Sequence, residues 1–236
     1  MVIRLLPATL LGLGLLFGTQ VAIAATPAKA FTATYNVLQG GQAMGVATIQ
    51  LRAAGDGQWI YSKDVKGTAG LAALLGASVS ESSRFRWNGD VPEAISYDYK
   101  MQAAVKQKQR HMTVDWANSR VTVDEGKGAQ SYAASPGMVE RNTLALALGL
   151  ALRDGKQQIA LPVAVRQEVQ TQNFAVTGKE VVTVPAGSFD AERIDRTDAD
   201  RGFSAWYVPA RYPLPVKLSQ HDGGDLVMEL VSYRTD

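Results

Sequence analysis

Cysteine is absent from this sequence of 236 residues, and histidine occurs only twice. Without cysteine the chain can form no disulfide and no thiolate nucleophile, which excludes disulfide-stabilised small proteins and cysteine hydrolases. His111 and His221 are far apart in the sequence, so they do not provide the clustered ligands that a zinc site requires. We therefore expect neither a metal site nor any other cofactor.

A strong charge of one sign is also missing. Lys and Arg total 24 against 22 Asp and Glu, a net charge of +2. Because proteins that bind nucleic acid usually carry a clearly basic balance or stripe, we expect no nucleic-acid partner. A disordered chain would have fewer apolar residues than the 46% found here and a larger net charge. The composition indicates an ordered globular protein.

The N-terminal stretch has the pattern of a secretory signal. Arg4 precedes a mostly apolar run, Leu5 to Phe17, and Ala22-Ile23-Ala24 has the small side chains that signal peptidase selects. The run is shorter and more interrupted than the about 20 apolar residues of a membrane span, although an uncleaved anchor is the alternative. We expect a signal peptide at 1–24 and one β-rich domain at 25–236.

Cleavage after Ala24 would leave 212 residues with a net charge of +1. No later segment is long and apolar enough for a transmembrane span. A lipid-modified N-terminus needs a cysteine after the apolar run, and none is present. We therefore expect an exported protein that is periplasmic, soluble and not a lipoprotein.

Alternation of apolar and polar residues dominates the rest of the chain, as is typical of half-buried strands. Clear examples are Ile95 to Met101 and Met112 to Trp116. Turn-forming residues separate such runs, as at Gly55-Asp56-Gly57, Asn88-Gly89-Asp90 and Gly126-Lys127-Gly128. About ten to twelve short strands with such turns predict a mainly β fold: a large curved antiparallel sheet that forms a roll, half-barrel or barrel.

Two segments depart from this alternation. Val139 to Arg153 predicts a helix in which Asn142 caps the start and Gly155 follows the end. Because leucine and alanine fill 144–152 apart from Gly149, the helix should be apolar nearly all round and therefore buried. The segment 67–76 is small and apolar without strand periodicity, which predicts a mobile loop or a second, short helix.

Three groups of residues are candidates for a binding site. Aromatic side chains on alternating strands could line a cavity for an apolar ligand, or could simply form the core. They are Trp59, Tyr61, Phe85, Trp87, Tyr97, Tyr99 and Trp116. Leu71, Leu74 and Leu75 could form a lid with glycine hinges, or a short helix that covers the core. Lys106, Lys108 and Arg110 share a strand face and could form a basic rim for anionic headgroups or cell-wall polymers, or a solvated strand end.

The residue patterns of common enzymes do not occur. There is no Gly-x-Ser-x-Gly turn and no phosphate-binding glycine loop, and Ser78 to Ser83 is expected to be a polar loop or a strand edge. Carboxylate pairs such as Asp124 with Glu125 could serve a glycosidase, but any chain with 22 acidic residues offers such pairs. We expect no catalytic residues.

Several motifs resemble those of the domain of unknown function 3108 family of exported bacterial proteins. Val184 to Ala191 resembles its VPAG-[ST]-[FY]-x-A stretch. The other matching features occur in the family's order. They are Gly89 to Pro92 before Tyr97 and Tyr99, Lys106, Lys108 and Arg110 before Asp115-Trp116, a helix ending in Leu152-Arg153, and Trp206, Pro209 and Leu214-Pro215-Val216.

The match extends from about Phe31 to Tyr233, nearly all of the expected mature chain. The family commonly begins its helix with Asp, whereas Asn142 stands here, so a role that needs a carboxylate at this position is in doubt. The resemblance implies an exported β-rich protein, similar by analogy to the half-barrels of lipoprotein carriers, in which a curved sheet wraps round helices.

These observations favour a non-catalytic periplasmic protein that binds a hydrophobic or amphipathic envelope component, or a protein partner, in the concave face of its sheet. One alternative is a structural or interaction protein of the cell envelope. The other is an envelope polysaccharide hydrolase, which would require two carboxylates facing each other in a pocket.

Overall fold

A computed structural model describes residues 27–199, 202–221 and 225–235. The predicted signal peptide at 1–24 lies outside the described residues. The strands of the first half are β1 (Phe31–Gln39), β2 (Gln42–Gly55), β3 (Gln58–Gly67), β4 (Ser78–Asn88), β5 (Val91–Ala103), β6 (Lys106–Asp115), β7 (Arg120–Asp124) and β8 (Ala129–Ala133). Those of the second half are β9 (Val139–Glu140), β10 (Gln158–Ala164), β11 (Val169–Val184), β12 (Gly187–Arg196), β13 (Phe203–Tyr207), β14 (Lys217–Gln220) and β15 (Leu226–Thr235). The helices are α1 (Gly70–Leu74) and α2 (Leu144–Arg153).

All described strands belong to one 15-stranded sheet. Its spatial order runs from β8 back to β1, continues with β15 and then runs back to β9. Consecutive strands of the chain therefore pair with each other, except β8 and β9. Pairing between β1 and β15 joins the two halves of the sheet. The ends of the sheet, β8 and β9, are not paired with each other, so the sheet is curved but open.

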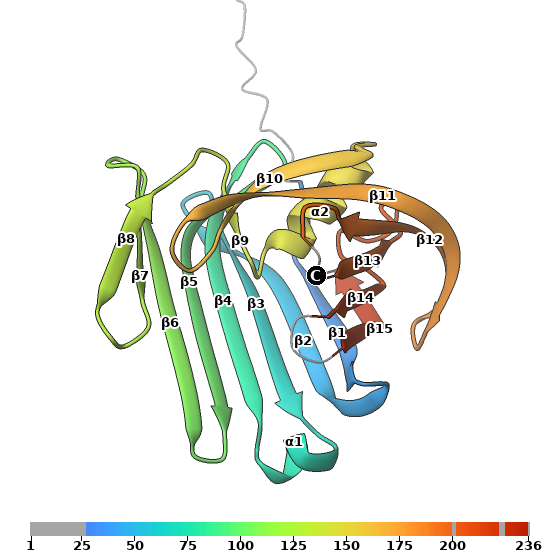
Figure 1. Ribbon diagram of the computed structural model, residues 1–236. Helices are drawn as coiled ribbons and strands as arrows, with labels where there is room; N and C mark the ends of the chain where they lie inside the picture. The colour runs from blue at the N-terminus through green and yellow to red at the C-terminus, as the bar shows by residue number, and fades with distance from the viewer. Residues whose placement is uncertain (1–26, 200–201, 222–224, 236) are drawn as a thin grey trace, which may run out of the picture.

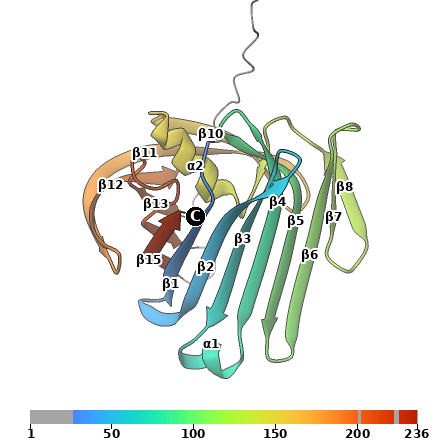
Figure 2. The same ribbon diagram turned by 180° about the vertical axis from the view of Figure 1, so that it is seen from behind.

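The sheet curves around α2 (Figures 1 and 2). Strands β2 to β6 form one long wall, β10 and β11 pass over α2, and β12 to β15 form the opposite side. This confirms the predicted mainly β fold with a large curved sheet and a buried helix. Two details differ from the prediction: there are more strands than ten to twelve, and β9 pairs with β10 in parallel. One of the additional strands, β9, has only 2 residues and pairs with β10.

The leucines of α2 face two parts of the core. Leu144, Leu148 and Leu152 pack in a cluster with β10, β11, β12 and β13, whereas Leu146 and Leu150 join a cluster with β1 to β4 and β14 to β15. Residues four apart lie on the same helix face, so leucine at every second position produces two opposite apolar stripes. This explains why a helix with strand-like leucine spacing is stable inside this sheet.

Gly149 has a packing reason in this helix. A Cβ atom added there would overlap the carbonyl oxygen of Pro213 and lie 3.1 Å from Cε1 of Tyr207. The Tyr207 hydroxyl also donates a 2.9 Å hydrogen bond to the carbonyl of Ala145, one turn earlier. The absence of a side chain at Gly149 therefore lets the loop after β13 approach the helix closely.

The predicted start of this helix was wrong. We expected it at Val139, but Val139–Glu140 forms the parallel strand β9 and the helix begins at Leu144. The first residues extend along β10 because pairing there satisfies their backbone groups.

The predicted turns at 55–57, 88–90 and 126–128 each contain residues with positive φ, including Gly55, Asp56, Gly89 and Gly126. The prediction for Ser78 to Ser83 was wrong: this segment is the first half of β4, which pairs on both sides with β3 and β5. Its serines obscure the strand pattern, because small polar side chains on both faces leave little alternation in hydrophobicity. Of the two described helices, neither is long and apolar enough to span a bilayer.

Candidate functional site

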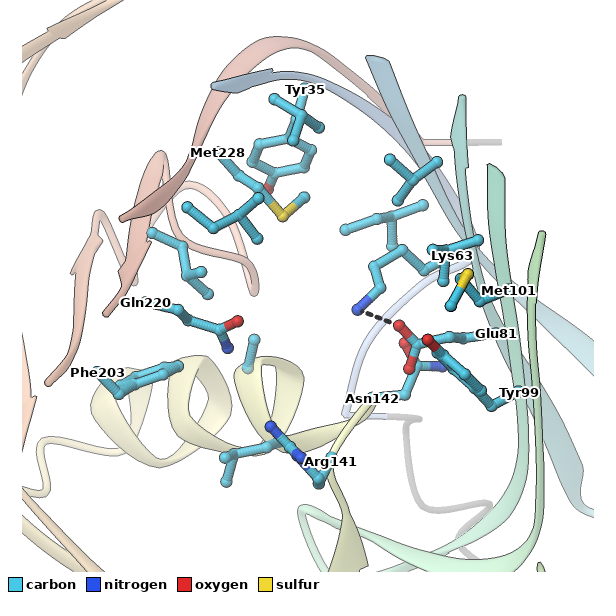
Figure 3. Close-up of a pocket in the computed structure, with 18 of the residues that line it drawn as sticks. Tyr35, Lys63, Glu81, Tyr99, Met101, Arg141, Asn142, Phe203, Gln220 and Met228 are labelled. Atoms are coloured by element: carbon cyan, nitrogen blue, oxygen red, sulfur yellow. Dashed lines mark ion pairs between the residues drawn. The ribbon is translucent and has the colours of Figure 1, made fainter. Parts of the chain in front are cut away.

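A cavity lies between the long wall of the sheet, α2 and the strands β14 and β15. Its volume is about 580 Å³. Figure 3 shows residues that line the cavity, with Tyr35 and Met228 at one end, and Lys63, Glu81 and Tyr99 along the wall. The cavity exists because the sheet curves more widely than α2 can fill.

Apolar side chains form much of its surface. They come from β1, β2, β3, α2, the loop before β14 and the last two strands, and include Val37, Ile49, Val65, Leu144, Ala145, Leu214, Leu218 and Met228. Tyr35 adds only its apolar ring to this surface, because its buried hydroxyl donates a 2.8 Å hydrogen bond to the carbonyl of Pro215. This surface can accept a hydrocarbon group without leaving polar atoms unpaired.

A charged pair interrupts this apolar lining on the β3–β4 wall. Lys63 and Glu81 lie opposite each other in the pairing of the two strands, and Lys63 Nζ is 2.7 Å from Glu81 Oε1. The hydroxyl of Tyr97 donates a 2.7 Å hydrogen bond to the other oxygen, Oε2. Both oxygens of this carboxylate therefore have partners.

The surroundings of Glu81 keep it ionised. Burial alone would raise its pKa, but the charge of Lys63 and hydrogen bonds from Lys63 and Tyr97 outweigh burial, and the charge of Arg141 adds to their effect. The pKa of Glu81 is consequently lowered from its ordinary value. At neutral pH this side of the cavity holds a carboxylate that is already neutralised by Lys63.

Arg141 is one of three further basic residues in the lining, with Lys66 and Arg196. It follows β9 directly, in the turn that leads into α2, and its exposed side chain reaches into the cavity in Figure 3. The ion pairs formed among the described residues do not include its guanidinium. Arg141 therefore presents N–H donors to whatever occupies the cavity.

A buried polar network holds the turn that carries Arg141. Glu140 is 2% exposed, and its carboxylate accepts hydrogen bonds from the backbone N–H groups of Asn142, at 2.7 Å, and Thr143, at 3.0 Å. The Asn142 side chain donates to Ser83 Oγ at 2.8 Å and to the Tyr61 carbonyl at 3.3 Å. The network ties the start of α2 to β3 and β4, and so fixes the backbone from which Arg141 projects.

This network corrects the predicted cap. Thr143 occupies the N-cap position without a side-chain capping bond, and Asn142 points to the sheet instead of capping the helix. The acceptor for the N–H groups at this end is the carboxylate of Glu140. A carboxylate thus does serve the helix start, but two residues before the position that the family resemblance indicated.

Glu140 has no ion-pair partner among the described residues and is almost completely buried. Burial raises its pKa from the ordinary value, and the nearby charge of Glu81 raises it further, whereas hydrogen bonds from Ser83, Asn142 and Thr143 oppose the rise. One acceptor in the network is unused, because Asn142 Oδ1 is buried without a hydrogen-bond partner among the described residues.

The seven aromatic candidates are distributed over several places. Tyr61 and Tyr99 line the cavity, and Tyr97 holds Glu81 from beside it. Trp59, Phe85 and Trp87 pack together, with ring centroids 6.1 Å apart for the two tryptophans and 4.8 Å for Phe85 and Trp87. Trp116 lies at the end of β6, where its Nε1 donates a 3.0 Å hydrogen bond to the Ala94 carbonyl.

The lid candidates belong to α1 and the residue after it. Leu71, Leu74 and Leu75 are exposed, while Ala72 between them lines the cavity. Helix α1 packs closely on the end of β3, since a Cβ added at Gly67 would lie 2.7 Å from the Ala72 carbonyl. The segment thus borders the cavity, and its opening and closing as a lid stays a prediction.

The basic rim candidates lie at the start of β6. Lys106 and Lys108 are exposed and pair in register with Ala103 and Met101, which line the cavity. Arg110 instead forms an ion pair with Glu125, 2.6 Å away. Of the three candidates, only Lys106 and Lys108 therefore offer unpaired charge among the described residues.

The sequence pattern did not indicate three charged residues of the cavity, which are Lys63, Glu81 and Arg141. Period-two spacing from Tyr61 places Lys63 on the same strand face, and Glu81 is likewise two residues from Ser83. That spacing could have indicated both residues, had 78–83 been recognised as a strand. No local signal marks Arg141, because its direction depends on the buried network beneath it.

Comparison with known proteins agrees with the fold. The chain is similar to the crystal structure of a beta-barrel-like protein of domain of unknown function DUF1849 from Brucella abortus, with a TM-score of 0.56 and 9% identity over 90% of this chain and 100% of that one. It also matches the complex structure of Pseudomonas aeruginosa MucA/MucB over 89% of this chain and 95% of that one. There the TM-score is 0.19 and the identity 13%, too low to carry any argument.

No curated protein matches the chain. A family model described as a protein of unknown function, DUF3108, matches residues 30–231.

Proposed function

We propose that this chain, which belongs to the DUF3108 family of proteins of unknown function, is an exported periplasmic protein that binds a hydrophobic or amphipathic envelope component. The observation that carries the proposal is the cavity of about 580 Å³ between the curved sheet and α2. Binding sites for small molecules have volumes of about 300–1,000 Å³ and are lined mainly by apolar side chains. The cavity has both properties.

The energetics of an apolar ligand fit this lining. Each methylene group moved from water to an apolar surface gains about 0.8 kcal/mol. Because Tyr35 and Met228 bring ring and thioether surfaces to the end opposite Arg141, a hydrocarbon chain there would contact apolar atoms on several sides. The flexible side chain of Met228 can also adapt to ligands of different shape.

The carboxylates near the cavity favour binding over catalysis. A glycosidase acid needs a raised pKa and access to its substrate. Glu81 lines the cavity but has a lowered pKa and two occupied oxygens. Glu140 has a raised pKa, but it is buried and accepts two backbone hydrogen bonds. These properties support a non-catalytic role over the alternative of a polysaccharide hydrolase.

The proposed location rests on the sequence. The pattern of residues 1–24 supports export, and the lack of cysteine supports a chain without a lipid anchor. An apolar ligand is poorly soluble in the water of an envelope compartment. A protein that carries or senses it there would have to shield it from water. An envelope interaction protein remains the alternative, favoured by the exposed lysines at the start of β6.

Titration with N-phenyl-1-naphthylamine, a neutral apolar dye whose fluorescence rises when it leaves water, tests ligand binding. We expect saturable binding to the wild-type protein. Ala145→Phe, which places a ring in the cavity from α2, should weaken dye binding about tenfold or more. Ala43→Phe, on the exposed start of β2, is the matched control and should bind like wild type.

Thermal unfolding of both variants establishes that each is folded. The proposal is wrong if the wild-type protein binds no dye, or if Ala145→Phe binds as tightly as Ala43→Phe. Native mass spectrometry of protein gently extracted from cells provides the identity of a bound envelope component.

A further inference from the structure

The two sides of the cavity differ in chemistry. Lys63, Tyr99 and Arg141 all lie toward the β3–β5 wall and the turn before α2, whereas Tyr35 and Met228 occupy the opposite end (Figure 3). A ligand that is apolar throughout would leave the guanidinium of Arg141 without an acceptor. The lining therefore matches a ligand with two unlike ends.

The charges indicate the sign of the polar end. Glu81 is the one acidic residue among the described cavity-lining residues, and Lys63 and Tyr97 already occupy both of its oxygens. Arg196, which also lines the cavity, is paired with Asp198 at 2.7 Å. Arg141 has no such partner among the described residues and reaches into the cavity. The uncompensated charge is therefore positive.

Arg141 is also held in position. Its backbone lies between Glu140, which bonds the N–H groups of the next two residues, and Asn142, which is tied to β3 and β4. A planar guanidinium presented from a rigid turn is suited to two parallel hydrogen bonds with a carboxylate or phosphate. Because the backbone at Arg141 is already fixed, only its side chain has to lose freedom when the anion binds.

We propose that the ligand is an amphiphile with one anionic head group, a carboxylate or a phosphate, which binds Arg141. The inference rests on the proposed function, because it names the chemical class of the ligand in the same cavity. Tyr99 and the remaining N–H groups of Lys63 lie on the side of this head group, and the hydrocarbon chain extends toward Tyr35 and Met228.

Displacement of N-phenyl-1-naphthylamine by four amphiphiles with the same hydrocarbon chain tests this. The probes are palmitate, hexadecyl phosphate, 1-hexadecanol and hexadecyltrimethylammonium, each below the concentration at which it aggregates. For wild-type protein we expect the two anions to bind about tenfold or more tightly than the alcohol and the cation. Inorganic phosphate alone should not displace the dye.

Arg141→Met keeps the length of the side chain and removes its charge. We expect it to weaken palmitate and hexadecyl phosphate about tenfold and to leave 1-hexadecanol unchanged. Arg52→Met, an exposed arginine on β2 outside the cavity, is the matched control and should leave all affinities unchanged. Added salt should weaken the anions more than the alcohol.

The outcomes separate the two proposals. If no amphiphile and no dye binds, the proposed function itself is wrong. If the dye and 1-hexadecanol bind but the anions bind no more tightly, or if Arg141→Met leaves the anions unaffected, only the anionic head group is wrong. If inorganic phosphate competes as well as hexadecyl phosphate, the site recognises a free anion and the amphiphile is wrong.

A second inference comes from the outer surface, independently of the cavity. Four of the six large apolar side chains that are exposed in the described residues are Leu71, Leu74, Leu75 and Val105. Leu74 is 81% exposed, Leu71 68%, and Val105 at the β5–β6 turn is fully exposed. The two segments touch, because the Ala104 N–H donates a 2.7 Å hydrogen bond to the Leu75 carbonyl. We call these four residues the apolar tip.

The apolar tip lies at one end of the long wall, where α1 and the β5–β6 turn project together (Figures 1 and 2). The residues around it are basic. No Asp or Glu occurs at 65–80 or at 99–110 in the sequence, whereas these ranges include Lys66, Lys100, Lys106 and Lys108. All four lysines are exposed.

Leucine and valine side chains surrounded by lysines are complementary to the surface of an anionic lipid bilayer. The apolar groups can enter the boundary of the acyl chains while the ammonium groups contact phosphates. We infer that the apolar tip docks on an anionic membrane surface. Since Ala72 of α1 lines the cavity, docking would bring the cavity next to the lipid.

Flotation with vesicles tests this inference. We expect wild-type protein to float with vesicles containing phosphatidylglycerol and much less with pure phosphatidylcholine. Leu71→Ser with Leu74→Ser should reduce the bound fraction about fivefold, and Lys106→Ser with Lys108→Ser should remove most of its salt dependence. Val181→Ser, which changes an equally exposed apolar residue on β11, is the matched control.

The inference is wrong if the wild-type protein does not float with anionic vesicles. It is also wrong if Val181→Ser loses as much binding as the double leucine variant, because exposure anywhere on the surface would then suffice. Equal unfolding temperatures for the variants show that the loss is not caused by unfolding.

Discussion

Lys63 and Glu81 face each other across β3 and β4, with 2.7 Å between Nζ and Oε1, and they form the charged side of an otherwise largely apolar cavity. The pair is partly shielded from water, since the two side chains are 24% and 11% exposed. Its energetic effect should therefore exceed that of the ion pairs on the outer surface.

Lys63→Met should destabilise the protein by about 2 kcal/mol at pH 7, because it leaves the carboxylate of Glu81 buried with only Tyr97 as a partner. Urea unfolding measures this change. Lys179→Met removes the comparable pair with Glu192, in which the lysine is 73% exposed, and should change stability by less than about 1 kcal/mol. Equal effects of the two substitutions would show that burial adds nothing to the inner pair.

The raised pKa of Glu140 predicts that the free energy of unfolding falls as the pH rises. Because burial raises its pKa in the folded state above the ordinary 4.5, the folded protein holds this proton more tightly than the unfolded chain. The stabilisation from the proton is complete below 4.5 and is lost as the pH rises through the folded-state pKa. Urea unfolding from pH 4.5 upward should therefore show a decline that Glu140→Gln lacks.

Glu140→Gln has a second effect that does not depend on pH. The new amide N–H₂ group would face one of the two backbone N–H groups that donate to the carboxylate in the wild-type protein. The free energy of unfolding of the variant should therefore be lower by about 1–3 kcal/mol. Parallel curves for the variant and the wild-type protein across this pH range would contradict the assignment of the raised pKa to Glu140.

The lowered pKa of Glu93 predicts the opposite pH dependence, in which the free energy of unfolding falls as the pH decreases. Its buried carboxylate would have a raised pKa from burial alone, but hydrogen bonds from Gly137 N, Arg86 and Asn88 and the charge of Arg86 lower the pKa. The resulting stabilisation is present above the unfolded-state pKa and is lost as the pH falls through the folded-state pKa.

Glu93→Gln should accordingly destabilise the protein at pH 7 by about 1–3 kcal/mol and make acid unfolding less steep. Thermal unfolding at pH 3 to 7 measures both effects. Glu168→Gln, at an exposed residue that accepts a hydrogen bond from Gln170, is the control and should change neither. A wild-type acid transition in Glu93→Gln would exclude Glu93 as its source.

Gly149→Ala tests the close contact between α2 and the loop after β13. In an exposed helix the substitution would stabilise by about 1 kcal/mol. Here the new methyl group would overlap the Pro213 carbonyl, so we expect a loss of about 1–3 kcal/mol. Gly178→Ala on β11 meets no atom within 4 Å and should be close to neutral. Unfolding in urea compares the two, and a stabilised Gly149→Ala would show that the loop can move away.

Local pattern was sufficient for the class of fold. Alternation such as that from Ile95 to Met101 depends only on which neighbours share a strand face, and turns such as Asn88-Gly89-Asp90 depend on residues that tolerate positive φ. The leucine-alanine composition of 144–152 likewise required a buried helix. These features were predicted because their cause lies within a few residues of the chain.

Distant partners decided the start of the helix and the strand at 78–83. Val139 and Glu140 pair with β10, more than twenty residues later in the chain, and this pairing replaces the first helical turn. Ser78 to Ser83 becomes a central strand because β3 and β5 supply hydrogen bonds on both sides. Neither partner can be recognised from the local residues, since serine and glutamate have little preference for strands.

The composition of the cavity also depended on tertiary structure. Alternation places rings on strand faces, but the curvature of the sheet selects Tyr61 and Tyr99 for the cavity and packs Trp59, Phe85 and Trp87 together elsewhere. Arg141 points inward because Glu140 and Asn142 are bonded to groups that lie far away in the sequence or across the turn. Residue order alone establishes the two faces of a strand, whereas the cavity is created only when the open sheet curves around α2.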